Sequence, residues 1–107
     1  HSSRKQEAVA VATPEDFKFP PYLAIIRVKI GRNWNPPPGA KGIRAKVQFT
    51  ILRSGRVVEP DIVASSGNFY FDQAALRAIQ SSSPFPQLPE EFFQEQVMLS
   101  ADLMEKE

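Results

Sequence analysis

The sequence has no cysteine, and its one histidine is the first residue. Disulfides, thiolate metal sites and cysteine nucleophiles are thereby excluded, and no histidine within the chain is available as a catalytic base. The net charge is only +1, whereas a nucleic-acid-binding domain is expected to carry a clear excess of basic residues. Because no run of eighteen apolar residues occurs, no segment is predicted to cross a membrane.

Recognisable catalytic motifs are missing as well. The serines at Ser65, Ser66 and 81–83 have no activating partner in a known motif. Glu59 and Asp72 are predicted to be a strand-surface residue and a helix-dipole residue rather than catalytic carboxylates. Neither metal-ligand spacing nor a phosphate-binding glycine loop is present. We therefore predict that the chain is not an enzyme, has no small-molecule substrate and no nucleic-acid partner, and uses no cofactor or metal.

One small domain is predicted to fill most of the 107 residues. The opening His1-Ser2-Ser3 is typical of an expression tag, and Arg4–Lys18 show no sustained periodicity. Residues 1–19 are therefore predicted to be a tag remnant and a flexible linker, and residues 20–107 the folded domain. On this interpretation, any membrane anchor lies outside the chain.

Two helices are predicted from apolar residues that recur at helical spacing. The first begins at Pro20-Pro21, because proline is tolerated at the first helical position, and it ends before the three prolines at 36–38. Its apolar face predicts that Trp34, in line with three earlier apolar residues, lies in the core. The second helix is predicted over Phe69–Ser81, after capping side chains at 65–68.

Three strands are predicted from apolar and polar residues that alternate. Alternation is strict over 43–51, and a turn at Gly55 leads to a return strand over 57–64. Pro60 cannot donate a ladder hydrogen bond, so we expect it at a bulge or on a side with no partner. A third strand is predicted from Gln94 to Met104. The order helix, strand, strand, helix, strand predicts an α+β fold, in which one three-stranded sheet carries helices on one face.

Several motifs within this order of elements resemble one known family. They are Trp34 followed by Pro36-Pro37, the strand and turn Val47–Val57, the exit Ser65-Ser66-Gly67-Asn68, the pair Phe71-Asp72, the run Ala74-Ala75-Leu76, and Pro84-Phe85-Pro86. Together they resemble the C-terminal domain of the TonB/TolA family over roughly Pro20 to Met104. The resemblance implies that the three-stranded sheet is antiparallel and that its last strand lies at an edge.

The resemblance also implies a function. It implies a non-catalytic periplasmic energy-transducer domain, anchored to the inner membrane in the full-length protein, which couples the proton-motive force to outer-membrane transport. The implied partners are segments of outer-membrane receptors or periplasmic proteins, and an inner-membrane motor complex reached through an N-terminal region absent here. Two alternatives stay open: a TolA-like domain for envelope integrity that binds Tol-Pal partners, and a structural module that self-associates as a homodimer.

The last strand is the predicted partner-binding site. An edge strand presents unpaired backbone groups, to which an extended segment of another protein can add as a further strand. The predicted residues are Glu95, Gln96, Val97, Met98, Leu99, Ser100, Ala101 and Asp102. The alternative is an ordinary edge strand that is covered by the linker or by a second copy of the domain.

Neither the cations of the predicted hairpin nor Phe85 is predicted to be a recognition site. The cations of the hairpin are predicted to be solvated surface rather than a phosphate or lipid site, because two of them lie on the polar face of the strand. These cations are Arg44, Lys46, Arg53 and Arg56. In the loop that follows the second predicted helix, Phe85 is predicted to fill the core.

Overall fold

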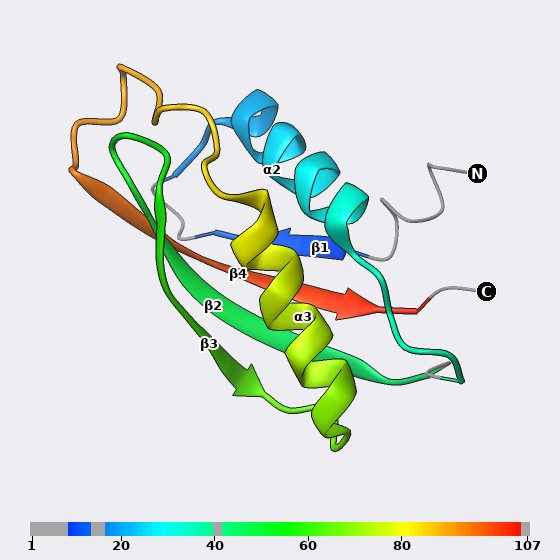
Figure 1. Ribbon diagram of the computed structural model, residues 1–107. Coiled ribbons are helices and arrows are strands. Elements are labelled where there is room, and N and C mark those ends of the chain that lie inside the picture. The colour runs from blue at the N-terminus through cyan, green and yellow to red at the C-terminus, as the bar shows by residue number, and fades with distance from the viewer. Residues whose placement is uncertain (1–8, 14–16, 40–41, 106–107) are drawn as a thin grey trace.

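The computed structural model describes residues 9–13, 17–39 and 42–105 of the chain. Within these ranges it has two helices, α2 (Pro20–Asn33) and α3 (Phe69–Ser82). Its four strands are β1 (Val9–Ala12), β2 (Arg44–Leu52), β3 (Val57–Ala64) and β4 (Gln96–Met104). The strands form one antiparallel sheet in the order β1-β4-β2-β3. Both helices cover the same face of the sheet, α2 over β1 and α3 over β2 and β3 (Figure 1).

The α+β class predicted from the sequence is confirmed, but the predicted count of three strands is wrong. The additional strand is β1, which lies within the segment predicted to be a linker. Phe17 of the same segment is also in the core, at 2% exposure. The division into residues 1–19 and 20–107 stays a prediction, and His1-Ser2-Ser3 lies outside the described residues.

The core lies between the sheet and the two helices. Every second residue of β2 and β4 is at most 4% exposed and faces the helices: Ala45, Val47, Phe49, Ile51, Val97, Leu99, Ala101 and Leu103. Trp34, which caps α2, is 1% exposed and meets the ring of Phe71 edge-on at 5.2 Å. Its indole Nε1 donates a hydrogen bond to the carbonyl of Met104 at 2.7 Å. The prediction that Trp34 lies in the core is confirmed.

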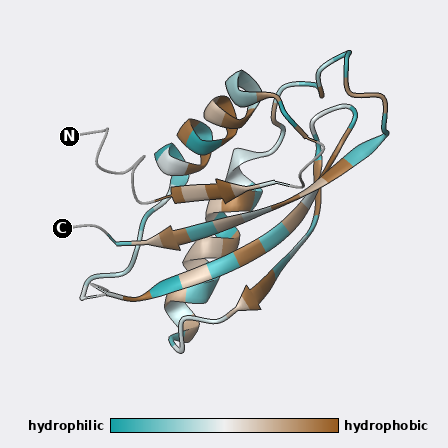
Figure 2. Ribbon diagram, turned by 180° about the vertical axis from the view of Figure 1, so that it is seen from behind, coloured by the Kyte–Doolittle hydropathy of each residue, from teal (hydrophilic) through white to brown (hydrophobic). Residues whose placement is uncertain are grey.

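The opposite face of the sheet carries no helix, as Figure 2 shows from behind. Lys46, Gln48, Ser100 and Asp102 stand on this face, because they alternate with the buried residues of β2 and β4. Lys46 is paired with Asp102, and Gln48 with Ser100, across the two central strands. A sheet that is apolar on one side and polar on the other is what the alternation in the sequence predicts.

A bulge interrupts β3, the strand at one edge of the sheet. The register between β2 and β3 shifts between Gln48 and Thr50, so two residues of β3 oppose one of β2. These residues are Glu59, with a positive φ of 54°, and Pro60. The prediction that Pro60 lies at a bulge or without a ladder partner is therefore confirmed.

The turn between β2 and β3 packs against the loop that follows α3. Gly55 has a φ of +97°, and its carbonyl accepts a hydrogen bond from the backbone N–H of Phe85 at 2.8 Å. Phe85 is 3% exposed and stacks on Phe49 with ring centroids 6.3 Å apart, as predicted for a residue that fills the core. Nearby, the hydroxyl of Tyr22 donates to the carbonyl of Pro86 at 2.7 Å, and burial raises the pKa of that hydroxyl to about 12.

The loop before α3 is held by one carboxylate. Asp72 accepts hydrogen bonds from the Ser65 hydroxyl at 2.5 Å, the Ser66 hydroxyl at 2.7 Å and the Ser66 N–H at 2.9 Å. The side chain of Asn68 caps the helix by accepting from the N–H of Phe71 at 3.1 Å, as expected from the capping residues in the sequence. Desolvation by burial raises the pKa of Asp72, but the three hydrogen bonds together outweigh it and the pKa lies below its usual value.

This lowered pKa predicts an acid-dependent loss of stability. As the pH falls, Asp72 is protonated near pH 4 in the unfolded chain and only at a lower pH in the folded protein. The contribution of Asp72 to the free energy of unfolding is therefore complete above about pH 4 and is lost as the pH falls through the folded pKa. Asp72→Asn is expected to cost about 1 kcal/mol at pH 7, and this difference from the wild type should shrink on acidification. Urea unfolding at several pH values measures it.

Removing the donors tests the cause of the shift. The double variant Ser65→Ala, Ser66→Ala keeps the carboxylate but loses both hydroxyl hydrogen bonds, so its stability should depend less on pH than that of the wild type. If the wild type and Asp72→Asn lose stability in parallel on acidification, the carboxylate has no special role in this loop.

Candidate partner-binding edge

The predicted partner-binding residues lie on β4, which is a central strand over part of its length. On one side, β4 pairs with β2 from Gln96, opposite Leu52, to Met104, opposite Arg44. This ladder uses all nine residues of the strand. The predicted binding surface is therefore limited to the other side of β4, which faces away from β2.

On that side, β1 covers the C-terminal part of β4. The register pairs Val9 with Leu103, Ala10 with Asp102, Val11 with Ala101 and Ala12 with Ser100. Over 100–103, the expectation that the last strand lies at an edge is wrong. Over 96–99, no described residue pairs with this side of β4 as a strand. Part of the predicted linker thus pairs with three of the eight predicted residues, Ser100, Ala101 and Asp102, which matches the alternative interpretation of the edge.

The side chains of the predicted residues divide between two faces. Val97, Leu99 and Ala101 are buried against the helices, and Gln96, Met98, Ser100 and Asp102 lie on the helix-free face. Glu95 is exposed and precedes the strand by one residue. These side chains do not converge on a pocket. What the site offers a partner is the backbone N–H and C=O groups along the outer side of β4.

Arg53 holds the loop that leads into β4. Its guanidinium donates to the carbonyl of Pro89 at 3.0 Å and to the carbonyls of Phe92 and Gln94. The backbone carbonyl of Arg53 also accepts from the N–H of Leu88 at 3.1 Å. The prediction that Arg53 is a solvated surface cation is therefore wrong, because its five-donor side chain is used to fix the direction of the chain just before Gln96.

The other cations of the hairpin differ from Arg53. Arg44 and Arg56 are exposed, as predicted for surface residues, and Lys46 is partly buried on the helix-free face. Arg44 and Lys46 share the helix-free face of β2, whereas Arg56 follows the turn at the other end of the strand, so the three cations are spread along the hairpin.

Two exposed apolar side chains lie in or near 96–99 along the chain. Phe93, in the loop before the strand, is 87% exposed, and Met98 within the strand is 51% exposed. Phe92 is buried and meets Phe17 at 4.8 Å, edge-on. Phe93 was not among the contacts predicted from the sequence. The signal was the Phe92-Phe93 pair, because adjacent side chains of an extended segment point to opposite sides.

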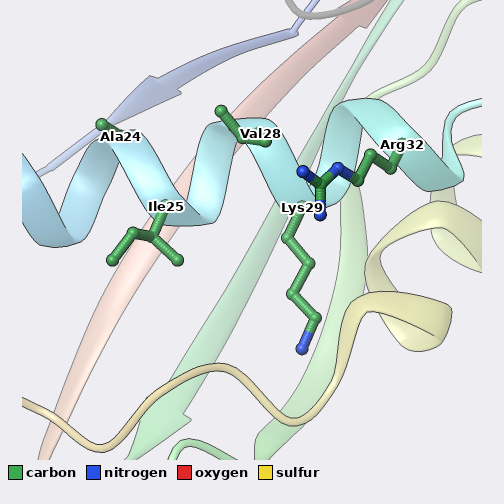
Figure 3. Close-up of a pocket in the computed structure, with 5 residues that line it drawn as sticks. All are labelled: Ala24, Ile25, Val28, Lys29 and Arg32. Atoms are coloured by element: carbon green, nitrogen blue, oxygen red, sulfur yellow. The ribbon is translucent and has the colours of Figure 1, made fainter.

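Two hollows lie elsewhere on the surface. One follows the outer side of α2 and is lined by Ala24, Ile25, Val28, Lys29 and Arg32 (Figure 3). Of its two cations, Lys29 already has partners within the domain. Its ammonium donates to the carbonyl of Pro84 and lies 5.8 Å from the ring centre of Phe85. The other, of about 350 Å³, lies beside the β3 bulge and is lined by Gln48, Phe49, Thr50, Glu59, Pro60, Asp61 and Met98.

The described part of the chain has neither a membrane-spanning helix nor a metal-binding cluster. No helix there is both long and apolar enough to cross a membrane. In the same residues, no three side chains of histidine, cysteine, aspartate or glutamate are grouped so as to hold a metal ion.

Comparison with known proteins gives a family match and, separately, a likeness of fold. A family model described as TonB C terminal matches residues 19–100. The solution structure of a TonB C-terminal domain from Helicobacter pylori has the same fold, with a TM-score of 0.68, 23% identity, and coverage of 97% of this chain and 92% of that one. The solution structure of TolAIII bound to a peptide derived from the N-terminus of TolB has a TM-score of 0.61 and 23% identity, covering 81% and 77%. No curated protein sequence matches this chain.

Proposed function

Because this chain belongs to the TonB C-terminal domain family, we propose that it is the partner-binding domain of a periplasmic energy transducer. Domains of this family are generally periplasmic and non-catalytic. In this proposal, the domain binds an extended segment of an outer-membrane receptor or another envelope protein. The chain that precedes it anchors the protein in the inner membrane, and the domain passes force derived from the proton gradient to its partner.

The observation that carries the proposal is the outer side of β4. Over 96–99 the strand has no strand partner among the described residues, although β2 holds its other side along its full length. An extended segment laid antiparallel or parallel against this side would gain backbone hydrogen bonds without any rearrangement of the core. Phe93 and Met98 are exposed and lie in or near this stretch of the chain, and in this proposal they supply apolar contacts.

The other edge of the sheet is poorly suited to the same task. β3 contains the bulge at Glu59 and Pro60, where one residue has a positive φ and the next has no N–H. Bulges and prolines are devices that prevent an edge from accepting a further strand. The two edges are therefore unequal, and the side of β4 is favoured as the place where a partner segment adds.

A solved relative supports binding of a peptide by this fold. The TolAIII structure contains a peptide from the N-terminus of TolB. A TolA-like role, with Tol-Pal partners and envelope integrity in place of receptor-coupled transport, is the second candidate. Both candidates use the same site and differ in the partner, so peptide identity separates them.

Strand addition is tested by an NMR titration of the ¹⁵N-labelled domain. Two sets of peptides are added: TonB-box segments of outer-membrane receptors, and the N-terminal segment of a TolB-like protein. We expect saturable amide shifts concentrated on Glu95–Asp102 with one set only, the first for a TonB-type transducer and the second for a TolA-type domain. Shifts elsewhere, or none with either set, would contradict the proposed site.

The binding mode needs its own control, because deletion of β4 would remove four core side chains and unfold the domain. Each binding peptide is instead made in two forms, N-methylated at alternate residues. In a strand, alternate residues direct their N–H groups to one side, so only one form should lose affinity, by about tenfold or more. Equal loss in both forms, or in neither, excludes strand addition. Sedimentation of the free domain at several concentrations measures the homodimer alternative separately.

A further inference from the structure

The side of β4 proposed to accept a partner already carries a strand of this chain. β1 is four residues long and pairs antiparallel with 100–103. It lies outside residues 19–100, which are the part of the chain that matches the family. β1 is placed on the edge at which the sheet would otherwise grow.

The side chains of β1 show what this edge accepts. Val9 is 2% exposed, and Val11 is partly buried against the same core. Ala10 and Ala12 are exposed on the helix-free face. β1 also packs against α2, which lies over it (Figure 1). The edge thus takes an extended segment with aliphatic side chains two residues apart, directed towards α2, and small residues between them.

We propose that β1 occupies, in the free domain, the part of the edge that a partner segment takes, so that β1 and the partner bind in competition. This inference rests on the proposed function, and it adds the chemistry of the partner: an extended segment with aliphatic side chains at alternate positions. A partner would first contact residues 96–99, which no described residue pairs with on this side of β4. It would then replace β1 along 100–103.

The fold allows this exchange without loss of the sheet. β4 stays paired with β2 over all nine of its residues when β1 leaves. Only one residue of β1, Val9, is fully buried, and the partner's own aliphatic side chain would refill its place. The hydrogen bonds of β1 are likewise replaced one for one. The free energy of such an exchange is therefore close to zero. The apparent affinity of a partner is its intrinsic affinity multiplied by the fraction of molecules in which β1 is released.

The absence of cysteine makes a covalent test unambiguous. Ala10 and Asp102 are opposite each other on the helix-free face, and in antiparallel pairs the Cα atoms are about 4.5–5.5 Å apart, within the range that a disulfide spans. The variant Ala10→Cys, Asp102→Cys therefore locks β1 on β4 when oxidised. The matched control, Lys46→Cys with Asp102→Cys, places a disulfide between β2 and β4 and leaves β1 free.

Binding of the envelope peptides used above is compared in the oxidised and reduced forms of both variants. The locked variant should bind the active peptide at least about tenfold more weakly when oxidised, and the control should change less than about twofold. If the oxidised locked variant binds as tightly as its reduced form, the partner adds without displacing β1. The inference is then overturned, although the proposed function stands.

A second measurement does not depend on envelope peptides. The double variant Val9→Asp, Val11→Asp releases β1, and a peptide copying residues 4–13 is added to it in an NMR titration. We expect saturable shifts at Ser100–Leu103 in the released variant, and none in the wild type or with a peptide that has aspartate at both valine positions. The locked variant, whose core sequence is intact, provides the comparison if the released variant is unstable.

The two experiments separate the two claims. If the copied peptide binds the released variant but no envelope peptide binds any of the variants, the proposed function fails. The edge still accepts an extended segment with aliphatic side chains at alternate positions. If the copied peptide does not bind a folded released variant, the edge does not accept an aliphatic strand in trans, and the inference is wrong whatever the envelope peptides do.

Discussion

Gly55→Ala is expected to destabilise the domain by about 3–4 kcal/mol, which is a large part of the roughly 5–15 kcal/mol that stabilises a typical domain. A Cβ at this position would lie 1.9 Å from the carbonyl oxygen of Phe85 and 2.9 Å from that of Pro86. Both are backbone atoms, so no side-chain rotation relieves the clash. The φ of +97° adds strain of about 1–3 kcal/mol for any residue with a Cβ.

The loop that meets Gly55 has little freedom to move away. The N–H of Phe85 is bound to the Gly55 carbonyl at 2.8 Å, the carbonyl of Pro86 accepts from the buried Tyr22 hydroxyl, and the Phe85 ring fills the core. A shift of the loop would break these contacts together. Urea unfolding followed by circular dichroism gives the loss of stability.

Gly67→Ala is the matched control for this variant. Gly67 has a similar φ of +87°, but a Cβ there would have no atom within 4 Å. The control should cost about 1–2 kcal/mol, from the backbone conformation alone. The difference between the two variants isolates the contact with the 85–86 loop. Equal losses would mean that the loop adjusts freely and does not depend on close packing against the turn.

Trp34→Ala is expected to cost about 3–5 kcal/mol. The indole is 1% exposed, meets Phe71 edge-on at 5.2 Å, and donates from Nε1 to the Met104 carbonyl at 2.7 Å. The substitution therefore leaves a large cavity and also an unpaired carbonyl at the end of β4. Amide hydrogen exchange at the C-terminal end of β4 should become faster along with the global loss of stability.

Tyr70→Ala controls for the loss of an aromatic ring. Tyr70 is 73% exposed and should change the free energy of unfolding by no more than about 0.5 kcal/mol. Because Trp34 is the only tryptophan, both variants are followed by circular dichroism rather than fluorescence. If Trp34→Ala cost as little as Tyr70→Ala, the indole would not be an anchor between α2 and β4.

The sequence predicted the elements whose pattern is long and strong. Apolar and polar residues alternate over 43–51, every second residue of β4 is apolar from Val97 to Leu103, and α2 starts at a proline and repeats its apolar residues at helical spacing. In such segments every residue agrees with the same structure, so local pattern and tertiary packing give one answer. The bulge at Pro60 was also predictable, because a missing N–H is visible in the residue type itself.

The missed features depend on contacts between distant parts of the chain. β1 consists of Val9-Ala10-Val11-Ala12, in which all four residues are apolar, so no alternation of apolar and polar residues marks it as a strand. It becomes a strand because it pairs with Ser100–Leu103. Arg53 was misassigned for the same reason: its acceptors are backbone carbonyls of the 89–94 loop, and backbone carbonyls have no signature in the sequence.

The candidate site was therefore predicted in part. The strand that carries it was predicted correctly. The pairing of β1 with 100–103 could not be derived from periodicity, because the pattern shows which residues point to each face of the sheet and does not show which strand lies next to which. The role of Glu95–Asp102 in binding remains a prediction, which the titrations decide.

The bulge in β3 also limits how copies of this domain can assemble. Growth of an open-ended fibre by strand pairing requires each copy to offer two complementary edges. In the described sheet, one edge is interrupted at Glu59 and Pro60, and only the side of β1 and β4 is regular. Two copies that paired through that side would use both regular edges at once. Polymerisation would stop at the dimer, so an edge that accepts a strand in the proposed way would not become a seed for fibrils.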